Sequence, residues 1–286
     1  MGQKIAFQGI HGAYSEQAVH QHFGEDVQVV PCQSFTDIFA AIEAGEADHG
    51  LLPVENAHAG TVASSYELLM ENDLRVQGEV IFHVRHALMA PPGQKLVDLQ
   101  RVRSHPQALA QCEQFLRRHN LEAEPWYDTA GSARDLATAP IPGVGAIAGS
   151  FAADLYGLEV LEPNIEDVPF NFTRFFVLGM DDAAKAERSK TSLVFATRHR
   201  PAALYSCLVE FAEREINLTK IESRPRRNRP WEYIFYLDFE GHWQDPICEA
   251  GLVALLRKAS FVKMLGSYPA AETPIINVPT NGAGNL

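Results

Sequence analysis

The sequence predicts an α/β protein with two α/β lobes, followed by a smaller α+β unit of the ferredoxin-like type. Strand-like and helix-like patterns alternate through residues 1–180, and such alternation gives parallel sheets flanked by helices. A linker-like stretch, 181–188, follows, and beyond it the order becomes β-α-β-β-α-β, which is typical of a ferredoxin-like unit. The length of 286 residues suits about two domains, since a domain takes about 150 residues.

The first lobe opens with a short apolar strand and continues as alternating helices and strands. Ser34 is suited to cap a helix, because Phe35, Ile38 and Phe39 follow it with helical spacing, and Gly45 fits the end of that helix. The expected strands are 4–8, 27–30 and 49–52, the expected helices are 15–23 and the one after Ser34, and a loop is expected over 53–60.

The second lobe repeats the alternation, and two neighbouring lobes predict a ligand cleft between them. Its expected strands are 76–83, 86–90, 102–104, 122–126, 144–148 and 175–179, with helices from Pro106, Thr129 and Ser150.

The last unit is expected to have strands 191–196, 218–224, 233–239 and 262–268 and helices 204–215 and 246–259. The predicted domains are therefore 1–182 for the two lobes, 189–270 for the last unit and 271–286 for a loose tail.

Composition and charge exclude several classes of protein. No apolar run reaches about 18 residues, so no membrane span is expected. The N-terminus runs directly into the first expected strand and lacks the long apolar core of a secretion signal. Four scattered cysteines without a CxxC pair favour reduced thiols in a cytoplasmic protein over disulfides or a zinc site. Residues 1–187 hold 11 Lys/Arg and 26 Asp/Glu, a net charge of −15, which argues against nucleic acid as a partner.

Two loops at strand ends are candidates for ligand binding. Residues 9–15, Gly-Ile-His-Gly-Ala-Tyr-Ser, lead into a helix whose free N–H groups suit an anion, although a plain tight turn capped by Ser15 explains them equally well. Residues 53–60 place Glu55, Asn56 and a glycine at the carboxyl end of a strand, where open α/β sheets bind ligands; the alternative is a solvated surface loop.

Two further segments carry polar groups into the expected cleft. Ser104-His105-Pro-Gln107 starts a helix, and Gln111 lies one turn beyond Gln107 on the same side. Thr173 and Arg174 lie between aromatic residues beside a strand, where an arginine can bind a carboxylate with two hydrogen bonds. The alternatives are a structural histidine in the first case and a half-exposed edge strand in the second.

Three other patterns are set aside. The glycines of 143–149 have the wrong spacing for a dinucleotide loop, and the scattered histidines lack matching Cys or carboxylate ligands for a metal. The basic run 224–229 is better explained as a charged turn between two strands than as a nucleic-acid surface. We therefore expect no metal, no cofactor and no nucleic acid.

Taken together, these segments resemble the prephenate dehydratase family over most of the chain. The motifs that carry the resemblance are the glycine-rich opening at 9–15, Pro-Val-Glu-Asn at 53–56, Ser-His-Pro-Gln at 104–107 followed by Gln111, Asp-Thr-Ala-x-Ser-Ala at 128–133, and Thr-Arg-Phe at 173–175. The resemblance implies a catalytic region with a two-lobed periplasmic-binding-protein-like fold. The last unit resembles an ACT domain, a module that senses small molecules, through Glu-Ser-Arg-Pro at 222–225.

The resemblance also implies a reaction and a set of residues. Prephenate would lose carbon dioxide and water to give phenylpyruvate, driven by aromatisation without a cofactor, and Thr173 would be the general acid that helps hydroxide leave. Arg174, Asn56, Ser104 and Gln111 would donate to or orient the reacting groups. Backbone N–H groups at 9–12 and 129–132 would hold the carboxylates of the substrate. The implied substrate-binding residues are Gly9, His11, Gly12, Ser15, Glu55, His105, Gln107, Thr129, Ala130, Ser132, Asn171, Phe172 and Phe175.

The ACT resemblance implies inhibition by phenylalanine at an interface of a homodimer or homotetramer. The implied effector residues are Ala202, Ala203, Leu204, Asn217, Leu218, Glu222, Ser223, Arg224 and Pro225. One departure bears on this, because Ala202 stands where the family has glycine and its methyl group crowds the approach of an amino acid. Two alternatives remain open for the whole chain: a dehydratase for arogenate, the amino analogue of prephenate, and a binding protein without catalysis.

Overall fold

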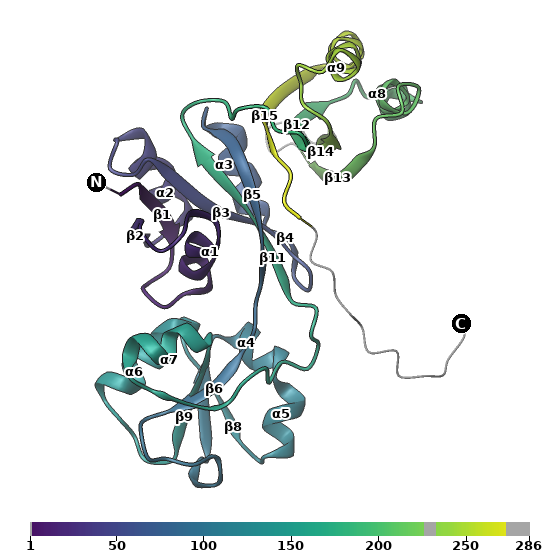
Figure 1. Ribbon diagram of the computed structural model, residues 1–286. Coiled ribbons are helices and arrows are strands. Elements are labelled where there is room, and N and C mark those ends of the chain that lie inside the picture. The colour runs from purple at the N-terminus through teal and green to yellow at the C-terminus, as the bar shows by residue number, and fades with distance from the viewer. Residues whose placement is uncertain (1, 226–232, 273–286) are drawn as a thin grey trace.

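A computed structural model describes residues 2–225 and 233–272, which form two α/β lobes and a C-terminal α+β domain (Figure 1). In the first lobe β1 pairs in parallel with both β2 and β3, whereas β11 runs antiparallel between β3 and β5. The elements of this lobe are β1 (Lys4–Gln8), α1 (Tyr14–Phe23), β2 (Gln28–Cys32), α2 (Phe35–Glu43), β3 (His49–Asn56), β4 (Gly60–Thr61), α3 (Ala63–Glu71), β5 (Arg75–His83) and β11 (Phe172–Gly179).

The second lobe is inserted between β5 and β11, so the chain crosses between the lobes twice, at residues 84–86 and 163–171 (Figure 1). Its sheet has the order β10-β6-β9-β7-β8. This double crossing is the arrangement of the predicted two-lobed fold. The elements are β6 (Ala87–Ala90), η1 (Leu96–Asp98), β7 (Arg101–Ser104), α4 (Pro106–Gln111), α5 (Glu113–Arg118), β8 (Glu122–Pro125), α6 (Thr129–Thr138), β9 (Val144–Ala148), α7 (Ser150–Tyr156) and β10 (Glu159–Glu162).

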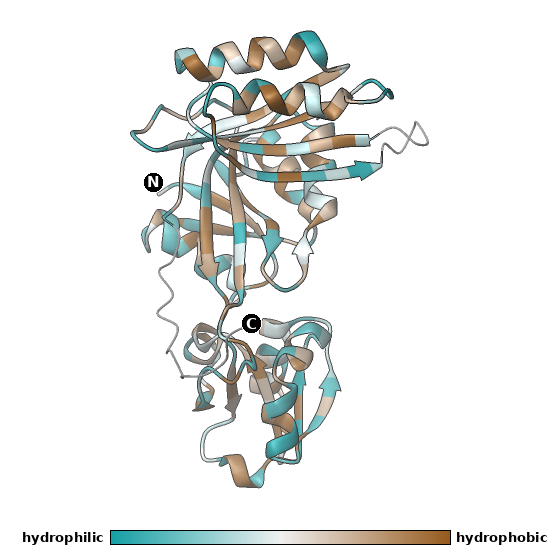
Figure 2. Cartoon of the chain, turned by 90° about the vertical axis from the view of Figure 1, so that its right-hand side faces the viewer, coloured by the Kyte–Doolittle hydropathy of each residue, from teal (hydrophilic) through white to brown (hydrophobic). Residues whose placement is uncertain are grey.

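The C-terminal domain has the strand order β13-β14-β12-β15, all antiparallel, which is the ferredoxin-like order for the predicted β-α-β-β-α-β chain. Helices α8 and α9 lie on one face of this sheet, and both carry hydrophobic and hydrophilic residues (Figure 2). The elements are β12 (Ser189–Ala196), α8 (Ala203–Ala212), β13 (Leu218–Pro225), β14 (Tyr233–Glu240), α9 (Pro246–Lys258) and β15 (Phe261–Pro269).

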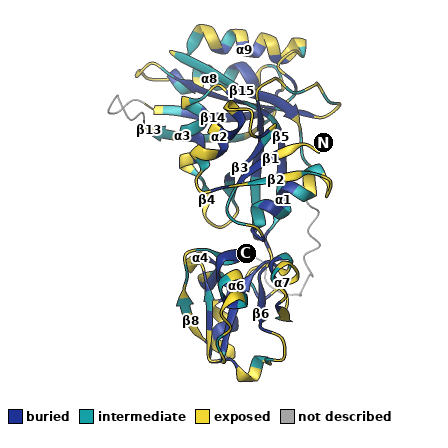
Figure 3. Cartoon of the chain, turned by 90° about the vertical axis from the view of Figure 1, so that its left-hand side faces the viewer, coloured by how far each residue is buried: buried dark blue, intermediate teal, exposed yellow. Residues whose placement is uncertain are grey.

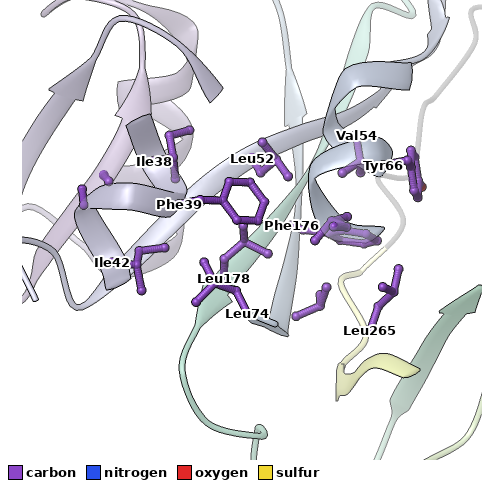
Figure 4. Packing of buried hydrophobic residues seen from close by; sticks show 14 of the residues in the cluster. Ile38, Phe39, Ile42, Leu52, Val54, Tyr66, Leu74, Phe176, Leu178 and Leu265 are labelled. Carbon is purple, nitrogen blue, oxygen red and sulfur yellow. The ribbon is translucent and has the colours of Figure 1, made fainter. Parts of the chain in front are cut away.

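The other face of the C-terminal sheet packs on the first lobe. One continuous hydrophobic cluster joins Phe39 of α2 and Phe176 of β11 to Leu265 of β15, all of them buried (Figure 4). Because this cluster is continuous, the C-terminal domain and the first lobe share one hydrophobic core, and its burial stabilises their contact. Figure 3 shows the same layering, with buried residues in the middle of β1, β3 and β5 and exposed residues along the outer side of α9.

Several predicted elements differ from the structure. The expected loop at 53–56 is the end of β3, because cross-strand hydrogen bonds from β11 and β4 hold it in the sheet. The expected helix from Pro106 is interrupted at Cys112, and β4, α3 and β10 were not predicted. The predicted tail at 271–286 lies outside the described residues except for Ala271 and Glu272, and the basic turn lies outside them from residue 226.

All four cysteines are free and buried, as the sequence predicts for reduced thiols. Among the described helices, none is both long and apolar enough to cross a membrane.

Replacing Ala202 with glycine is expected to stabilise the protein. Ala202 precedes α8 with φ 59° and ψ 10°, a left-handed conformation that disfavours a side chain. We expect Ala202→Gly to raise the free energy of unfolding by several tenths to about 1 kcal/mol in urea denaturation. The control is Ala250→Gly in the exposed interior of α9, which should cost about 1 kcal/mol. Equal destabilisation by both substitutions would contradict the prediction.

Candidate active site

A cavity of about 200 Å³ lies between the two lobes, where both crossing segments pass. Parallel strands of an open α/β sheet end at this edge, which is where such sheets bind ligands. Helices α1, α4 and α6 begin beside the cavity and supply residues to its wall. The residues that line it are Tyr14, Ser15, Pro53, Asn56, Val84, His86, His105, Gln107, Ala108, Gln111, Thr129, Asn171, Thr173 and Phe175.

The structure brings together nine of the residues expected at the site: Ser15, Asn56, His105, Gln107, Gln111, Thr129, Asn171, Thr173 and Phe175. Five other wall residues were not predicted, namely Tyr14, Pro53, Val84, His86 and Ala108. Tyr14 belongs to the glycine-rich motif, and His86 is one of the scattered histidines that were set aside as metal ligands. Only the positions of α1 and of the first crossing segment beside the cavity show that these two residues line it.

Asn56 and Thr173 lie opposite each other on adjacent strands, and their hydrogen bonds fix which atom donates. The Asn56 Oδ1 atom accepts from the backbone N–H groups of His58 and Ala59, at 3.0 and 2.9 Å. The Asn56 amide nitrogen therefore faces the other way and donates to Thr173 Oγ1 at 2.9 Å. Because Thr173 Oγ1 accepts from Asn56, the threonine proton is available to donate to a ligand in the cavity.

Gln111 presents its amide nitrogen in a similar way. Its Oε1 atom accepts from Asn171 Nδ2 at 3.0 Å and bonds His86 Nε2 at 2.7 Å. Both lone pairs of the oxygen are then occupied, and the two N–H bonds of the Gln111 amide remain for a ligand. The cavity wall thus offers neutral donors from both lobes.

No lysine, arginine, aspartate or glutamate lines this cavity among the described residues. Burial lowers the pKa of His86, although its bond to Gln111 and the nearby Glu166 oppose that shift. Burial also raises the pKa of Tyr14 well above its ordinary value. Both side chains are therefore neutral near pH 7, and within the described part of the chain no cluster of metal-ligating side chains occurs.

Arg174, Glu55 and Phe172, expected at the site, lie outside the cavity wall. Side chains alternate across a strand, so Arg174 points away from its neighbour Thr173. Its guanidinium contacts Glu79 at 2.7 Å and Asp238 of the C-terminal domain at 2.6 Å. Glu55 likewise pairs with Lys220 at 3.0 Å, and Phe172 stacks on His83.

Ser104, which was expected to donate to or orient the reacting groups, also lies outside the cavity wall. It is fully buried, and its hydroxyl donates to the Ile147 carbonyl oxygen at 2.6 Å. A hydroxyl committed to a buried carbonyl ties β7 to β9 and has no proton left for a ligand.

The glycine-rich turn does not present the free N–H groups that were expected of it. Gly9 N–H donates to the Cys32 carbonyl oxygen at 3.0 Å, and Gly12 N–H donates to Glu16 Oε2 at 2.5 Å. His11 contacts the same Glu16 carboxylate at 2.9 Å. The positive φ values of Gly9 (129°) and Gly12 (88°) shape the turn, so these glycines position Tyr14 and Ser15 rather than bind an anion.

The start of α6 is partly occupied in the same manner. Asp128 caps the helix by accepting from Gly131 N–H at 2.7 Å, and Ser132 is buried with its hydroxyl on the Thr129 carbonyl oxygen. Thr129 alone from this segment lines the cavity, and Ala130 packs in the core. The first turn of α6 therefore contributes at Thr129.

The residues expected to bind an effector fall into two groups. Ala202, Ala203 and Leu204 line a cavity of about 260 Å³ together with Tyr233 and Phe235. The others do not line that cavity. Asn217 lies just before the edge strand β13, and Leu218, Glu222, Ser223, Arg224 and Pro225 lie on that strand.

Acid is expected to destabilise the fold from about pH 6.5 downward. Burial is the main cause that lowers the pKa values of His86 and His242, which are 2% and 3% exposed. The unfolded chain, whose histidines titrate near 6.5, then binds more protons than the folded chain, so the free energy of unfolding falls as pH drops through this range. The urea midpoint of unfolding, measured at several pH values, checks this prediction. His86→Gln should reduce the fall of the midpoint with decreasing pH, whereas His119→Gln, at an exposed position, should leave that fall unchanged.

Comparison with known proteins finds similar sequences and structures over most of this chain. A family model described as Prephenate dehydratase matches residues 5–183. The chain is 40% identical over 281 residues to arogenate dehydratase/prephenate dehydratase 2, chloroplastic, of Arabidopsis thaliana, covering 94% of this chain and 74% of that protein.

Two solved structures have similar folds over nearly the whole chain. A prephenate dehydratase from Arthrobacter aurescens in complex with L-Phe has a TM-score of 0.86 at 31% identity, covering 97% of this chain and 93% of that one. A protein described as GqqA, a novel type of quorum quenching acylases, has a TM-score of 0.87 at 34% identity, covering 94% and 98%.

Proposed function

The chain belongs to the prephenate dehydratase family, and on that premise we propose that it converts prephenate to phenylpyruvate, carbon dioxide and water in L-phenylalanine biosynthesis. The observation that carries the proposal is the orientation of Thr173. Its oxygen accepts from Asn56 at 2.9 Å, so its proton faces the cavity between the lobes. A positioned proton donor is what the departure of a ring hydroxyl requires.

In the proposed reaction the ring carboxylate leaves as carbon dioxide while the ring hydroxyl leaves with a proton from Thr173. The electron pair of the broken C–C bond enters the ring, and the C–O pair leaves with the hydroxyl group, which takes the threonine proton and departs as water. The ring becomes aromatic, and Thr173 regains its proton from solvent when the products leave. General acid assistance contributes about 10²–10⁴-fold. The N–H bond from Asn56 stabilises the oxygen of Thr173 as its proton moves, and Phe175 closes the apolar side of the wall.

The cavity binds a dianion through neutral donors in this proposal. Gln111 offers two amide N–H bonds, and Ser15 and Thr129 lie in the first turns of α1 and α6, whose positive ends favour a carboxylate. No carboxylate lines the cavity among the described residues, so the ammonium group of arogenate would find no counter-charge there. We therefore place prephenate ahead of arogenate as the substrate.

Turnover by the purified chain tests the proposal. We expect phenylpyruvate to form from prephenate, with a higher kcat/KM than for arogenate measured in parallel. Faster turnover of arogenate would reverse the substrate assignment. Binding of prephenate without turnover would favour a binding protein, and acylase activity without prephenate turnover would favour the activity named for GqqA.

We also propose that phenylalanine inhibits through the C-terminal domain acting as an ACT domain. The cavity lined by Ala202 and Leu204 would hold the amino acid in this proposal, and a prephenate dehydratase of similar structure was solved in complex with L-Phe. Two ion pairs connect this domain to the catalytic strands: Lys220–Glu55 behind Asn56, and Asp238–Arg174 behind Thr173. A coupling of about 1–3 kcal/mol between the two sites would suffice for feedback.

Phenylalanine titration of prephenate turnover tests this coupling. We expect inhibition by the wild-type chain and weaker inhibition by Lys220→Met, because methionine removes the ion pair to Glu55 while keeping most of the side chain's length. Turnover that phenylalanine does not change would reject the feedback proposal and leave the dehydratase proposal standing.

The proposed assembly is a homodimer or homotetramer in the cytoplasm. Apolar side chains on the outer helices α8 and α9 are exposed, with Tyr205 at 69% and Leu256 at 59%, and a second copy would cover them. Four free cysteines suit a reducing compartment. A monomeric mass by light scattering at working concentration would contradict the assembly.

A further inference from the structure

We propose that Tyr14 and His86 are positioning residues for the reaction at Thr173, a role that rests on the proposed dehydratase function. They form one end of an unbroken chain of side-chain hydrogen bonds that reaches Thr173. The members, in order, are Tyr14, His86, Gln111, Asn171, Asn56 and Thr173. Neither Tyr14 nor His86 belongs to the residues expected from the sequence.

The chain of bonds joins both lobes and both crossing segments. Tyr14 lies on α1 of the first lobe, His86 on the first crossing and Gln111 on α4 of the second lobe (Figure 1). Asn171 lies on the second crossing and is 2% exposed, and Asn56 returns to the first lobe. The bonds form only when the lobes have the relative position seen here, so they hold the cavity in this arrangement.

The direction of every proton in the chain follows from two backbone groups. His58 and Ala59 donate to Asn56 Oδ1, so the Asn56 amide nitrogen faces Asn171 and bonds an acceptor, Asn171 Oδ1, at 2.9 Å. The Asn171 nitrogen then faces Gln111 and bonds its oxygen at 3.0 Å. The assignment of both amides is thereby fixed without reference to the histidine.

His86 must therefore carry a proton on Nε2. Its partner at 2.7 Å is the Gln111 oxygen, which can only accept. In neutral His86 the other nitrogen, Nδ1, has a lone pair and accepts from the Tyr14 hydroxyl at 2.7 Å. The Tyr14 hydroxyl also lies 3.1 Å from the Arg85 carbonyl oxygen, but a proton directed there would leave two lone pairs facing each other at 2.7 Å.

The consequence falls on Gln111. With its oxygen held by His86 and Asn171, its amide nitrogen is turned to the cavity, where a substrate carboxylate would bind. Without the Tyr14 hydroxyl, Nδ1 of His86 loses the donor that holds it unprotonated, so its proton is free to move to Nδ1 and its Nε2 would then repel the Gln111 oxygen. The amide would rotate and present an acceptor to the substrate instead of donors.

Steady-state kinetics with prephenate and ¹⁵N NMR of the histidine rings test the proposal. We expect Tyr14→Phe to lower kcat about tenfold and His86→Leu about 10²-fold, because a misdirected donor loses most of its effect. His86→Gln, which can restore an N–H to Gln111, should recover part of the loss. The control Tyr127→Phe removes a hydroxyl that bonds Asp135 and Arg134 outside the cavity, and its kinetics should match wild type.

The NMR measurement separates a positioning role from a packing role. We expect His86 of the wild type to show a protonated Nε2 and an unprotonated Nδ1, and Tyr14→Phe to show a mixture of both tautomers. Wild-type kcat in Tyr14→Phe, or an Nδ1-protonated His86 in the wild type, would overturn the proposal. Wild-type turnover of prephenate reports separately on the proposed function, and the tautomer is measurable whether or not turnover occurs.

Discussion

Replacement of Thr173 by valine is expected to abolish most of kcat while the protein folds normally. Valine keeps the shape of threonine and removes the hydroxyl that is proposed to donate its proton in the cavity. The loss should be about 10²–10⁴-fold, the range for a general acid. Thr173 is half-buried on β11, and the buried side chains of Phe175 and Phe176 hold this strand in the core. The fold therefore does not depend on the hydroxyl of Thr173.

The matched variant is Thr173→Ser, which retains the hydroxyl and loses only a methyl group. We expect it to keep a substantial part of kcat, and KM to change little in either variant. Phenylpyruvate formation from prephenate measures kcat, and urea denaturation checks the fold. Turnover by Thr173→Val within a few-fold of wild type would remove Thr173 from the mechanism.

Replacement of Arg174 by glutamine is expected to cost about 3–5 kcal/mol of folding free energy, because it removes the guanidinium from the buried Asp238 carboxylate and leaves Lys190 as the cation beside the buried Glu79 carboxylate. Glu79 and Asp238 are 3% and 1% exposed, and both contact the guanidinium within 2.7 Å. Burial opposes the charge of Arg174, but Tyr268, Asp238 and Glu79 together raise the pKa of Arg174 above its ordinary value. Burial likewise opposes the charge of Glu79, yet Arg174 and Lys190 lower the pKa of Glu79.

The comparison variant is Arg134→Gln. Arg134 pairs with Asp135 at the surface, its side chain is 45% exposed, and its loss should cost no more than about 1 kcal/mol. Urea denaturation of both variants at one pH measures the difference. A cost for Arg174→Gln as small as that for Arg134→Gln would show that the cluster between the lobe and the C-terminal domain contributes little.

The fold class was predictable because its signals are local. The alternation of strand and helix patterns and the β-α-β-β-α-β order of the last unit follow from spacing within short windows, and the structure confirms both. The prediction of a loop over residues 53–56, which form the end of β3, was wrong because the polar residues there are typical of a loop. Partners distant in sequence, on β11, supply the hydrogen bonds that hold it as a strand.

The site was predictable in part. Motifs at strand ends and helix starts identified Asn56, Gln111 and Thr173, and the structure places all three around one cavity. The roles of Gly9 and Gly12 were wrong in the same region, since Cys32 and Glu16 take the N–H groups that an anion would need. A sequence shows which donors a turn has, but not which acceptors the fold brings to them.

By itself, the sequence determined the class of fold, the family and the segments from which the site is built. The tertiary structure alone decided which side of each strand faces the cavity: Thr173 toward it, Arg174 toward the C-terminal domain. It also decided that His86 joins Tyr14 to Gln111. The physical reason is that the direction of a hydrogen bond and the partner of a buried charge depend on residues far apart in the chain, which only packing brings together.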